Sequence, residues 1–243
     1  MRMQTFAKRN AKEILRDPIT LTFGLGFPLV LILLLTLIQS SIPVPLFELP
    51  HLTPGISVFG LSFITLFTAT IIAKDRSSSL LQRLYTTPLT AADFLWGYSL
   101  PLIPMAIGQS ILCYVVAILL GLPITINILY AIIAIVPVSL LYIALGLLFG
   151  SILNEKQVGG ICGALLTNLS AWLSGTWFDL DLMGSTFQKI AHALPFVHAV
   201  ELHRAILVGD YAGIFPHLLW VLGYTAVLFA AAIFLFLRQM KKQ

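Results

Sequence analysis

The stretch ITLTFGLGFPLVLILLLTLI, residues 19–38, decides the fold class, because it runs for 20 residues without Asp, Glu, Lys or Arg. About 20 consecutive apolar residues are needed to cross the hydrocarbon core of a bilayer as a helix. The run is too long for the apolar part of a secretory signal, and no small-residue cleavage site follows it. We therefore expect residues 19–38 to form a membrane-spanning helix.

Five further apolar runs follow, none with a charged side chain in its interior: 56–73, 94–120, 124–153, 158–177 and 214–237. The composition agrees, since 58% of the residues are hydrophobic and 10% are charged, against roughly 45–50% and 25% in soluble domains. This composition excludes a water-soluble globular protein and, with it, nucleic-acid binding as a main role. We expect one all-α membrane domain over residues 1–243, embedded in the lipid bilayer by six transmembrane helices.

The basic residues indicate how the bundle is oriented. Twelve of the fourteen Lys and Arg residues fall in the two tails and in the second and fourth connecting segments, on one side of a six-helix bundle. Only Lys189 and Arg204 fall on the other side. Because basic residues accumulate on the cytoplasmic side, we expect a multi-pass protein of the plasma (inner) membrane with both termini cytoplasmic. Cys113 and Cys162 lie inside apolar runs and are expected to be buried side chains without a disulfide.

Residues 1–17 have a pattern of their own. Apolar residues recur at helical spacing from Met3 to Leu15, and basic residues occupy the opposite side. The pattern predicts an amphipathic interfacial helix on the inner membrane surface, with Asp17-Pro18 ending it before the first span. The alternative is a tail whose charge only orients the protein.

The segment 75–93 is the longest polar connection on the basic side, within KDRSSSLLQRLYTTPLTAAD (residues 74–93). Leu80, Leu81 and Leu84 share one helical face, which predicts a short amphipathic helix that Pro88 would stop. Thr90 would start the third span in a capping-box-like arrangement. The leucine face fits either a groove on a cytoplasmic partner or the inner face of the bundle itself, and the pattern leaves both open.

This segment resembles the signature of the permease subunits of type-2 ABC exporters, of the kind that export drugs or lipids. The resemblance rests on Asp75-Arg76, the serines that follow, Leu81 to Leu84 and the Thr-Pro-Leu-Thr sequence that ends at Thr90, with Asp75 where the family usually has glutamate. A second stretch, from Pro195 to Gly209, resembles the family's outer segment before the last span. The resemblance extends over the whole chain and implies extracellular helices, short and re-entrant or interfacial, over residues 178–213.

The resemblance also implies a partner and an energy source. In such exporters the loop between spans two and three docks onto a separate cytoplasmic ATP-binding subunit, and the contact would be carried here by Arg76, Leu80, Leu81, Arg83, Leu84, Tyr85 and Pro88. That subunit would bind ATP and Mg, and this chain would bind no cofactor and would work as a homodimer or with a second permease. The chain itself has no phosphate-binding loop for ATP and no ionisable residue inside a span, so we expect no enzyme activity and no proton coupling of its own.

The second and fifth apolar runs are the most polar, and hydroxyl, amide and aromatic side chains share their faces. We expect them to line a substrate path that includes Phe59, Phe63, Thr65, Phe67, Thr68, Thr167, Asn168 and Trp172. Such a lining favours a hydrophobic or amphipathic cargo, such as a drug, a lipid-like molecule or a peptide. The alternative is that these residues, and the Gly-x-x-x-Gly pairs Gly146–Gly150 and Gly159–Gly163, only pack helices within the chain.

Three further residues are expected in the outer segment: Pro195 at the start of a helix, and Glu201 and Arg204 paired three positions apart on it. His198 lies one turn from Glu201, but no tight cluster of ligands accompanies it, so no metal site is expected.

Three other functions are compatible with the composition. A passive channel or facilitator needs no ATPase. An intramembrane serine hydrolase could use Ser62, in Gly60-Leu61-Ser62, with His217 as base, although Phe63 replaces the closing glycine of that motif. A structural assembly factor would have no transport phenotype.

Overall fold

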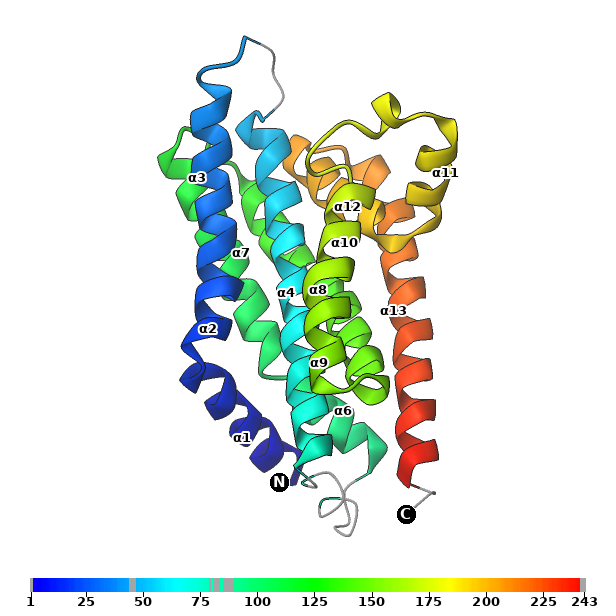
Figure 1. Cartoon of the computed structure of the whole chain (residues 1–243). Helices are drawn as coiled ribbons and strands as arrows, with labels where there is room; N and C mark the ends of the chain where they lie inside the picture. The colour runs from blue at the N-terminus through cyan, green and yellow to red at the C-terminus, as the bar shows by residue number, and fades with distance from the viewer. Residues whose placement is uncertain (1, 44–46, 79, 81–83, 85–89, 241–243) are drawn as a thin grey trace.

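The computed structural model describes residues 2–43, 47–78, 80, 84 and 90–240, and all regular structure in these ranges is helical. Five helical stretches are long and apolar enough to cross a membrane: Pro18–Gln39, Leu49–Ser77, Ala91–Leu119, Ile126–Ile152 and Tyr211–Arg238. Figure 1 shows them running side by side as one bundle. The predicted all-α membrane fold is confirmed, and five of the six predicted spans correspond to these stretches.

The stretches differ in how continuous they are. The first consists of α2 (Pro18–Leu21), the π-helical turn η1 (Thr22–Gly26) and α3 (Phe27–Gln39). The third consists of α6 (Ala91–Ser99) and α7 (Leu102–Leu119), separated at Pro101, which has no N–H to continue a helix. The other three are the single helices α4 (Leu49–Ser77), α8 (Ile126–Ile152) and α13 (Tyr211–Met240).

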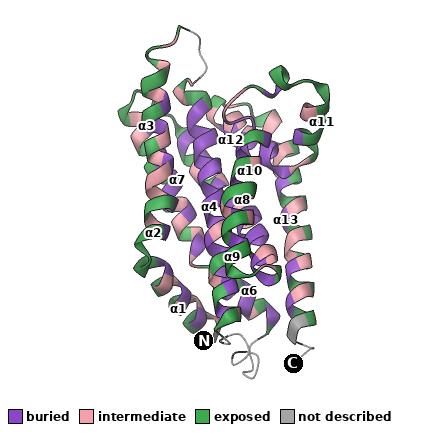
Figure 2. Cartoon of the chain, viewed as in Figure 1, coloured by how far each residue is buried: buried purple, intermediate pink, exposed green. Residues whose placement is uncertain are grey.

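The helix α4 lies at the centre of the bundle. Of its most apolar stretch 83% is buried inside the protein, against 22% for the first stretch and 17% for α13. Figure 2 shows α4 as mostly buried. The helix α8 packs along α4 through two glycines. A Cβ on Gly146 would lie 2.8 Å from the carbonyl oxygen of Thr65, and one on Gly150 would lie 2.8 Å from the Cα of Ala69. This Gly-x-x-x-Gly pair therefore serves close packing within the chain.

The predicted span over residues 158–177 differs from the structure. This part of the chain forms α9 (Glu155–Val158), the π-helix η2 (Gly159–Leu166) and α10 (Thr167–Leu173), which Figure 1 shows as one column beside α4. Helix ends at Leu173, since Gly175 turns the chain with φ +68°. The apolar part of the column is therefore about 24 Å long at 1.5 Å per residue, short of the ~30 Å hydrocarbon core. The described residues give five candidate spans, and a sixth is not confirmed.

The two ends of the bundle carry different secondary elements. The helix α1 (Arg2–Arg16) lies obliquely across one end of the bundle, and α13 finishes at the same end (Figure 1). The opposite end carries the 3₁₀ turn η3 (Leu180–Met183), α11 (Ser185–Ala193) and α12 (Pro195–Val208). Short helices were expected there, and α12 begins at Pro195 as predicted and ends at Gly209, which has φ +85°.

Candidate functional site

The amphipathic helix predicted at the N-terminus is present as α1, and it packs on the bundle through one face. Phe6, Asn10 and Ile14 are one turn apart and buried. The ring of Phe6 makes edge-to-face contacts with Tyr98 and Phe94 of α6, with centroids 4.9 and 5.7 Å apart. The Nδ2 of Asn10 donates a hydrogen bond of 3.0 Å to the carbonyl oxygen of Gly97. The helix α1 is therefore fixed to α6.

A buried carboxylate joins α1 to the last turn of α4. Asp75 is 1% exposed and accepts hydrogen bonds from Arg9 Nη1 at 2.6 Å, Arg9 Nη2 at 2.7 Å and Tyr98 Oη at 2.8 Å. Partial burial lowers the pKa of Arg9, but the hydrogen bond to Asp75 and its charge outweigh this and the pKa is raised. Glu13 extends the group, since it pairs with Arg9 at 2.8 Å and with Lys74 at 2.9 Å. We call these five residues (Arg9, Glu13, Lys74, Asp75 and Tyr98) the Asp75 cluster.

The residues predicted to contact the ATPase follow directly after this cluster. Arg76 donates hydrogen bonds to the carbonyl oxygens of Gly150 and Leu153, at 2.9 and 3.2 Å, and so covers the C-terminal end of α8. Leu80 and Leu84 are helical and half-buried, and Leu84 packs against the main hydrophobic core. Leu81, Arg83, Tyr85 and Pro88 lie outside the described residues. Among the described members, Arg76 and Leu84 therefore contact the bundle itself.

The structure separates the residues of the expected substrate path into three groups. Phe59, Phe63 and Phe67 lie on one face of α4 and form an aromatic cluster with Phe27 and Trp177, with neighbouring centroids 5.5–6.5 Å apart.

The hydroxyl residues of α4 lie elsewhere. Thr65 Oγ1 donates a hydrogen bond of 2.7 Å to the carbonyl oxygen of Tyr142 on α8. Thr68 Oγ1 donates one of 2.6 Å to the carbonyl oxygen of Ile64 within its own helix. Both side chains are buried. The Thr65 hydroxyl therefore stabilises the α4–α8 contact, as the packing alternative predicts, whereas the Thr68 hydroxyl is bonded within α4.

The members on η2 and α10 form the third group. Thr167 is buried and donates 3.0 Å to the carbonyl oxygen of Cys162. Asn168 is exposed, and its Nδ2 donates a hydrogen bond of 2.7 Å to the carbonyl oxygen of Ala164. Trp172 is 50% exposed. Nothing lies within 4 Å of a Cβ built on Gly159, so this second Gly-x-x-x-Gly pair begins on an open face.

The predicted ion pair is present on α12, because Arg204 Nη1 lies 2.7 Å from Glu201 Oε1. Arg204 also donates to the carbonyl oxygens of Gly175 at 2.8 Å and His51 at 3.4 Å, and thus joins α12 to the loop after α10 and to the start of α4. His198 Nδ1 lies 2.9 Å from His217 Nδ1, and burial lowers the pKa of His198.

The alternative sites do not come together in the described part of the chain. Ser62 Oγ is buried without a hydrogen-bond partner there, while His217 contacts His198 instead. No group of three or more His, Cys, Asp or Glu side chains in the described ranges could hold a metal ion. Cys113 and Cys162 are buried and free, as expected.

Sequence reasoning did not single out the Asp75 cluster. The sequence pattern indicates Asp75 only as part of a motif, and Arg9 only as one of several basic residues in the N-terminal helix. One signal was available, because Asp75 lies two residues after an apolar run and an acid there needs a partner once buried.

A bundle of long apolar helices defines a multi-pass membrane protein. A family model described as ABC-2 type transporter matches residues 1–208. The chain therefore belongs to the ABC-2 type transporter family, whose membrane domain lacks an ATPase site and pairs with an ATP-binding subunit. A search of curated protein sequences finds no match.

Proposed function

We propose that this chain is the membrane subunit of an ATP-driven exporter, and that a separate cytoplasmic ATP-binding subunit docks on residues 75–93. The observation that supports this most is the path of α4. This helix is buried at the centre of the bundle and runs without a break into the Asp75 cluster, where the docking segment begins. A displacement of that segment would be transmitted directly to α4, because packed helices move as rigid elements.

The orientation follows from the same end of the bundle. The helix α1, with its basic residues, and the end of α13 lie at the same end of the bundle, and the positive-inside rule supports placing that end in the cytoplasm. Both termini on one side require an even number of spans. We therefore propose that the α9–η2–α10 column is the sixth membrane helix, with the bilayer locally thinned to match its short apolar part, and that the protein resides in the plasma membrane.

The open face of that column supports a role in assembly. Gly159 faces open space, and Asn168 and Trp172 are exposed. An amide on a membrane helix is costly to leave toward lipid, so a second copy of this chain or a second permease would cover this face. The cargo path would then run beside the aromatic cluster of α4, which suits a hydrophobic or amphipathic molecule such as a drug, a lipid-like molecule or a peptide.

The docking proposal is tested by co-expression with an ABC ATP-binding subunit and affinity purification of the tagged permease. The double variant Arg83→Asp and Leu84→Asp should lose the subunit, and the matched control Leu182→Asp, at an exposed leucine of η3, should retain it. Retention of the subunit by the double variant at normal expression would overturn the proposed docking segment.

The complex of permease and ATP-binding subunit should also hydrolyse ATP, and the ATP-binding subunit alone should bind the ATP and Mg. Cargo efflux that stops when ATP is withheld would distinguish the exporter from a passive facilitator, which would continue. A hydrolase would instead lose its activity in Ser62→Ala, and an assembly factor would show no efflux at all.

A further inference from the structure

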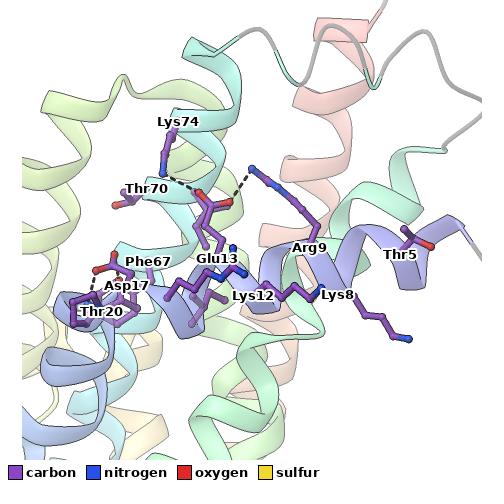
Figure 3. Close-up of a pocket in the computed structure, with 14 residues that line it drawn as sticks. Thr5, Lys8, Arg9, Lys12, Glu13, Asp17, Thr20, Phe67, Thr70 and Lys74 are labelled. Carbon is purple, nitrogen blue, oxygen red and sulfur yellow. Dashed lines mark hydrogen bonds and ion pairs between the residues drawn. The ribbon is translucent and has the colours of Figure 1, made fainter.

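A pocket of about 870 Å³ lies between α1 and α4, beside the start of α2 (Figure 3). It is not part of the proposed docking segment or of the proposed cargo path, apart from one wall residue, Phe67. Five basic and two acidic side chains line it: Lys8, Arg9, Lys12, Arg16, Lys74, Glu13 and Asp17. The pocket is therefore strongly basic.

Both acids of the pocket are already bound by neighbouring groups. Glu13 lies between Arg9 and Lys74, which reach it from two sides in Figure 3. Asp17 accepts a hydrogen bond from Thr20 Oγ1 at 2.8 Å and others from the N–H groups of Thr20 and Ile19, and these bonds lower its pKa. The net positive charge of the pocket is therefore carried by Lys8, Lys12 and Arg16, whose charges the two acids do not neutralise.

These three side chains form a stripe along α1. Lys8, Lys12 and Arg16 are spaced by four residues, which places them on one face of the helix, one turn apart. All three are exposed, and none makes an ion pair with a residue that the structure describes. A stripe of cations beside a cavity is complementary to a phosphate group, which accepts several charge-assisted hydrogen bonds.

The wall opposite the stripe changes polarity along its length. Phe67, Thr70, Ile71 and Lys74 line the pocket from one face of α4. Lys74 lies near the end of the helix, and Phe67 lies two turns further into the bundle. The pocket is thus charged at its outer part and apolar at depth, and this order matches a molecule with an anionic head and a hydrocarbon tail.

We propose that this pocket binds one anionic phospholipid, with the phosphate group at Lys8, Lys12 and Arg16 and the start of an acyl chain along Phe67 and Ile71. General attraction of a basic helix to an anionic leaflet gives about 1 kcal/mol per residue and no fixed stoichiometry. The cavity differs from this diffuse attraction, because it offers a defined binding site for one lipid per chain. Because α1 is joined to Asp75, a bound lipid also supports the position of the surface helix against α4.

The experiment uses the full chain in detergent, titrated with phosphatidylglycerol and followed by native mass spectrometry. The triple variant Lys8→Gln, Lys12→Gln and Arg16→Gln should bind this lipid at least tenfold more weakly. The matched triple Lys156→Gln, Lys189→Gln and Arg238→Gln removes three exposed charges outside the pocket and should stay within twofold of the wild type. Equal weakening in both triples would overturn the site in favour of diffuse attraction.

Two further arms identify what is recognised. Phosphatidylcholine should bind at least tenfold more weakly than phosphatidylglycerol, and millimolar inorganic phosphate should not displace the lipid. Displacement by phosphate would contradict the proposal of a lipid ligand and indicate that the pocket binds a soluble anion. Thr70→Trp fills the pocket from α4 without changing charge, so it should also weaken the lipid at an unchanged melting temperature. Wild-type affinity in that variant would overturn the pocket. No ATP-binding subunit is present, so the outcome is independent of the docking proposal.

Discussion

Arg9 of α1 donates two hydrogen bonds to Asp75 of α4, at 2.6 and 2.7 Å, across 66 positions of sequence. Asp75 lies at the end of the central helix and immediately before the proposed docking segment. Tyr98 of α6 donates a third hydrogen bond to the same carboxylate. One buried charge therefore fixes α1, α4 and α6 relative to one another.

Replacing Asp75 with Asn should destabilise the protein by no more than about 3 kcal/mol. Breaking a buried ion pair leaves the remaining charge without a partner, at a typical cost of 3–5 kcal/mol, and Arg9 is 37% exposed, so water compensates part of it. The loss is measured as a lower melting temperature in detergent. Glu48→Gln removes an acid that makes no side-chain cap at the start of α4, and it should leave the melting temperature unchanged. Equal melting temperatures of Asp75→Asn and the wild type would contradict the role given to the ion pair.

The two glycine pairs should respond differently to the same substitution. Gly150→Val places side-chain atoms against Ala69 of α4 and should destabilise by about 1–3 kcal/mol, as overpacked cores do. Gly159→Val meets no neighbouring atom within the chain and should leave the stability of the isolated subunit unchanged. Thermal unfolding of both variants under one condition gives the comparison, and a comparable loss in Gly159→Val would contradict the open face of η2.

Local features of this fold could be predicted from sequence because neighbouring residues determine them. The break at Asp17-Pro18, the capping box at Thr90, the start of α12 at Pro195 and the ion pair of Glu201 with Arg204 each involve residues within four positions of one another. Hydropathy likewise located five spans, because the length of an apolar run is itself the requirement for crossing a bilayer.

Partners distant in sequence could not be predicted in the same way. Periodicity assigned Arg9 to the polar face of α1 but gave no indication that α1 would lie beside Asp75. It also treated the two glycine pairs alike, although only Gly146 and Gly150 contact another helix backbone closely. The apolar run 158–177 extends beyond the helical column, which ends at Leu173, since hydropathy does not register the turn at Gly175.

Acid should destabilise the end of the bundle that carries α12, through His203. This side chain is fully buried on α12, and burial lowers its pKa from 6.5 to about 4. A histidine that is neutral when folded and charged when unfolded contributes stability above pH 6.5, and that stability is lost as the pH falls from 6.5 toward 4. The limiting slope is about 1.4 kcal/mol per pH unit for one proton.

Melting temperatures measured between pH 7.5 and pH 4.5 give the test. His203→Leu removes the titrating group, so its melting temperature should fall less steeply with acid. His192→Gln, at an exposed histidine on α11, is the control and should follow the wild-type curve. Parallel curves for all three proteins would exclude His203 as the origin of the acid sensitivity.

The proposed cargo path predicts that two neighbouring residues of α4 differ in their effect on transport. Phe63 belongs to the aromatic cluster with Phe27, with centroids 5.5 Å apart, so Phe63→Leu should lower efflux of an amphipathic dye severalfold by removing an aromatic surface. Thr68 hydrogen-bonds within its own helix at the α8 contact, and the near-isosteric Thr68→Val should leave efflux unchanged. Efflux is measured in cells that produce the permease with its ATP-binding subunit and is divided by the amount of permease in the membrane. A larger loss in Thr68→Val than in Phe63→Leu would move the path to the α4–α8 side and reject the aromatic cluster as its wall.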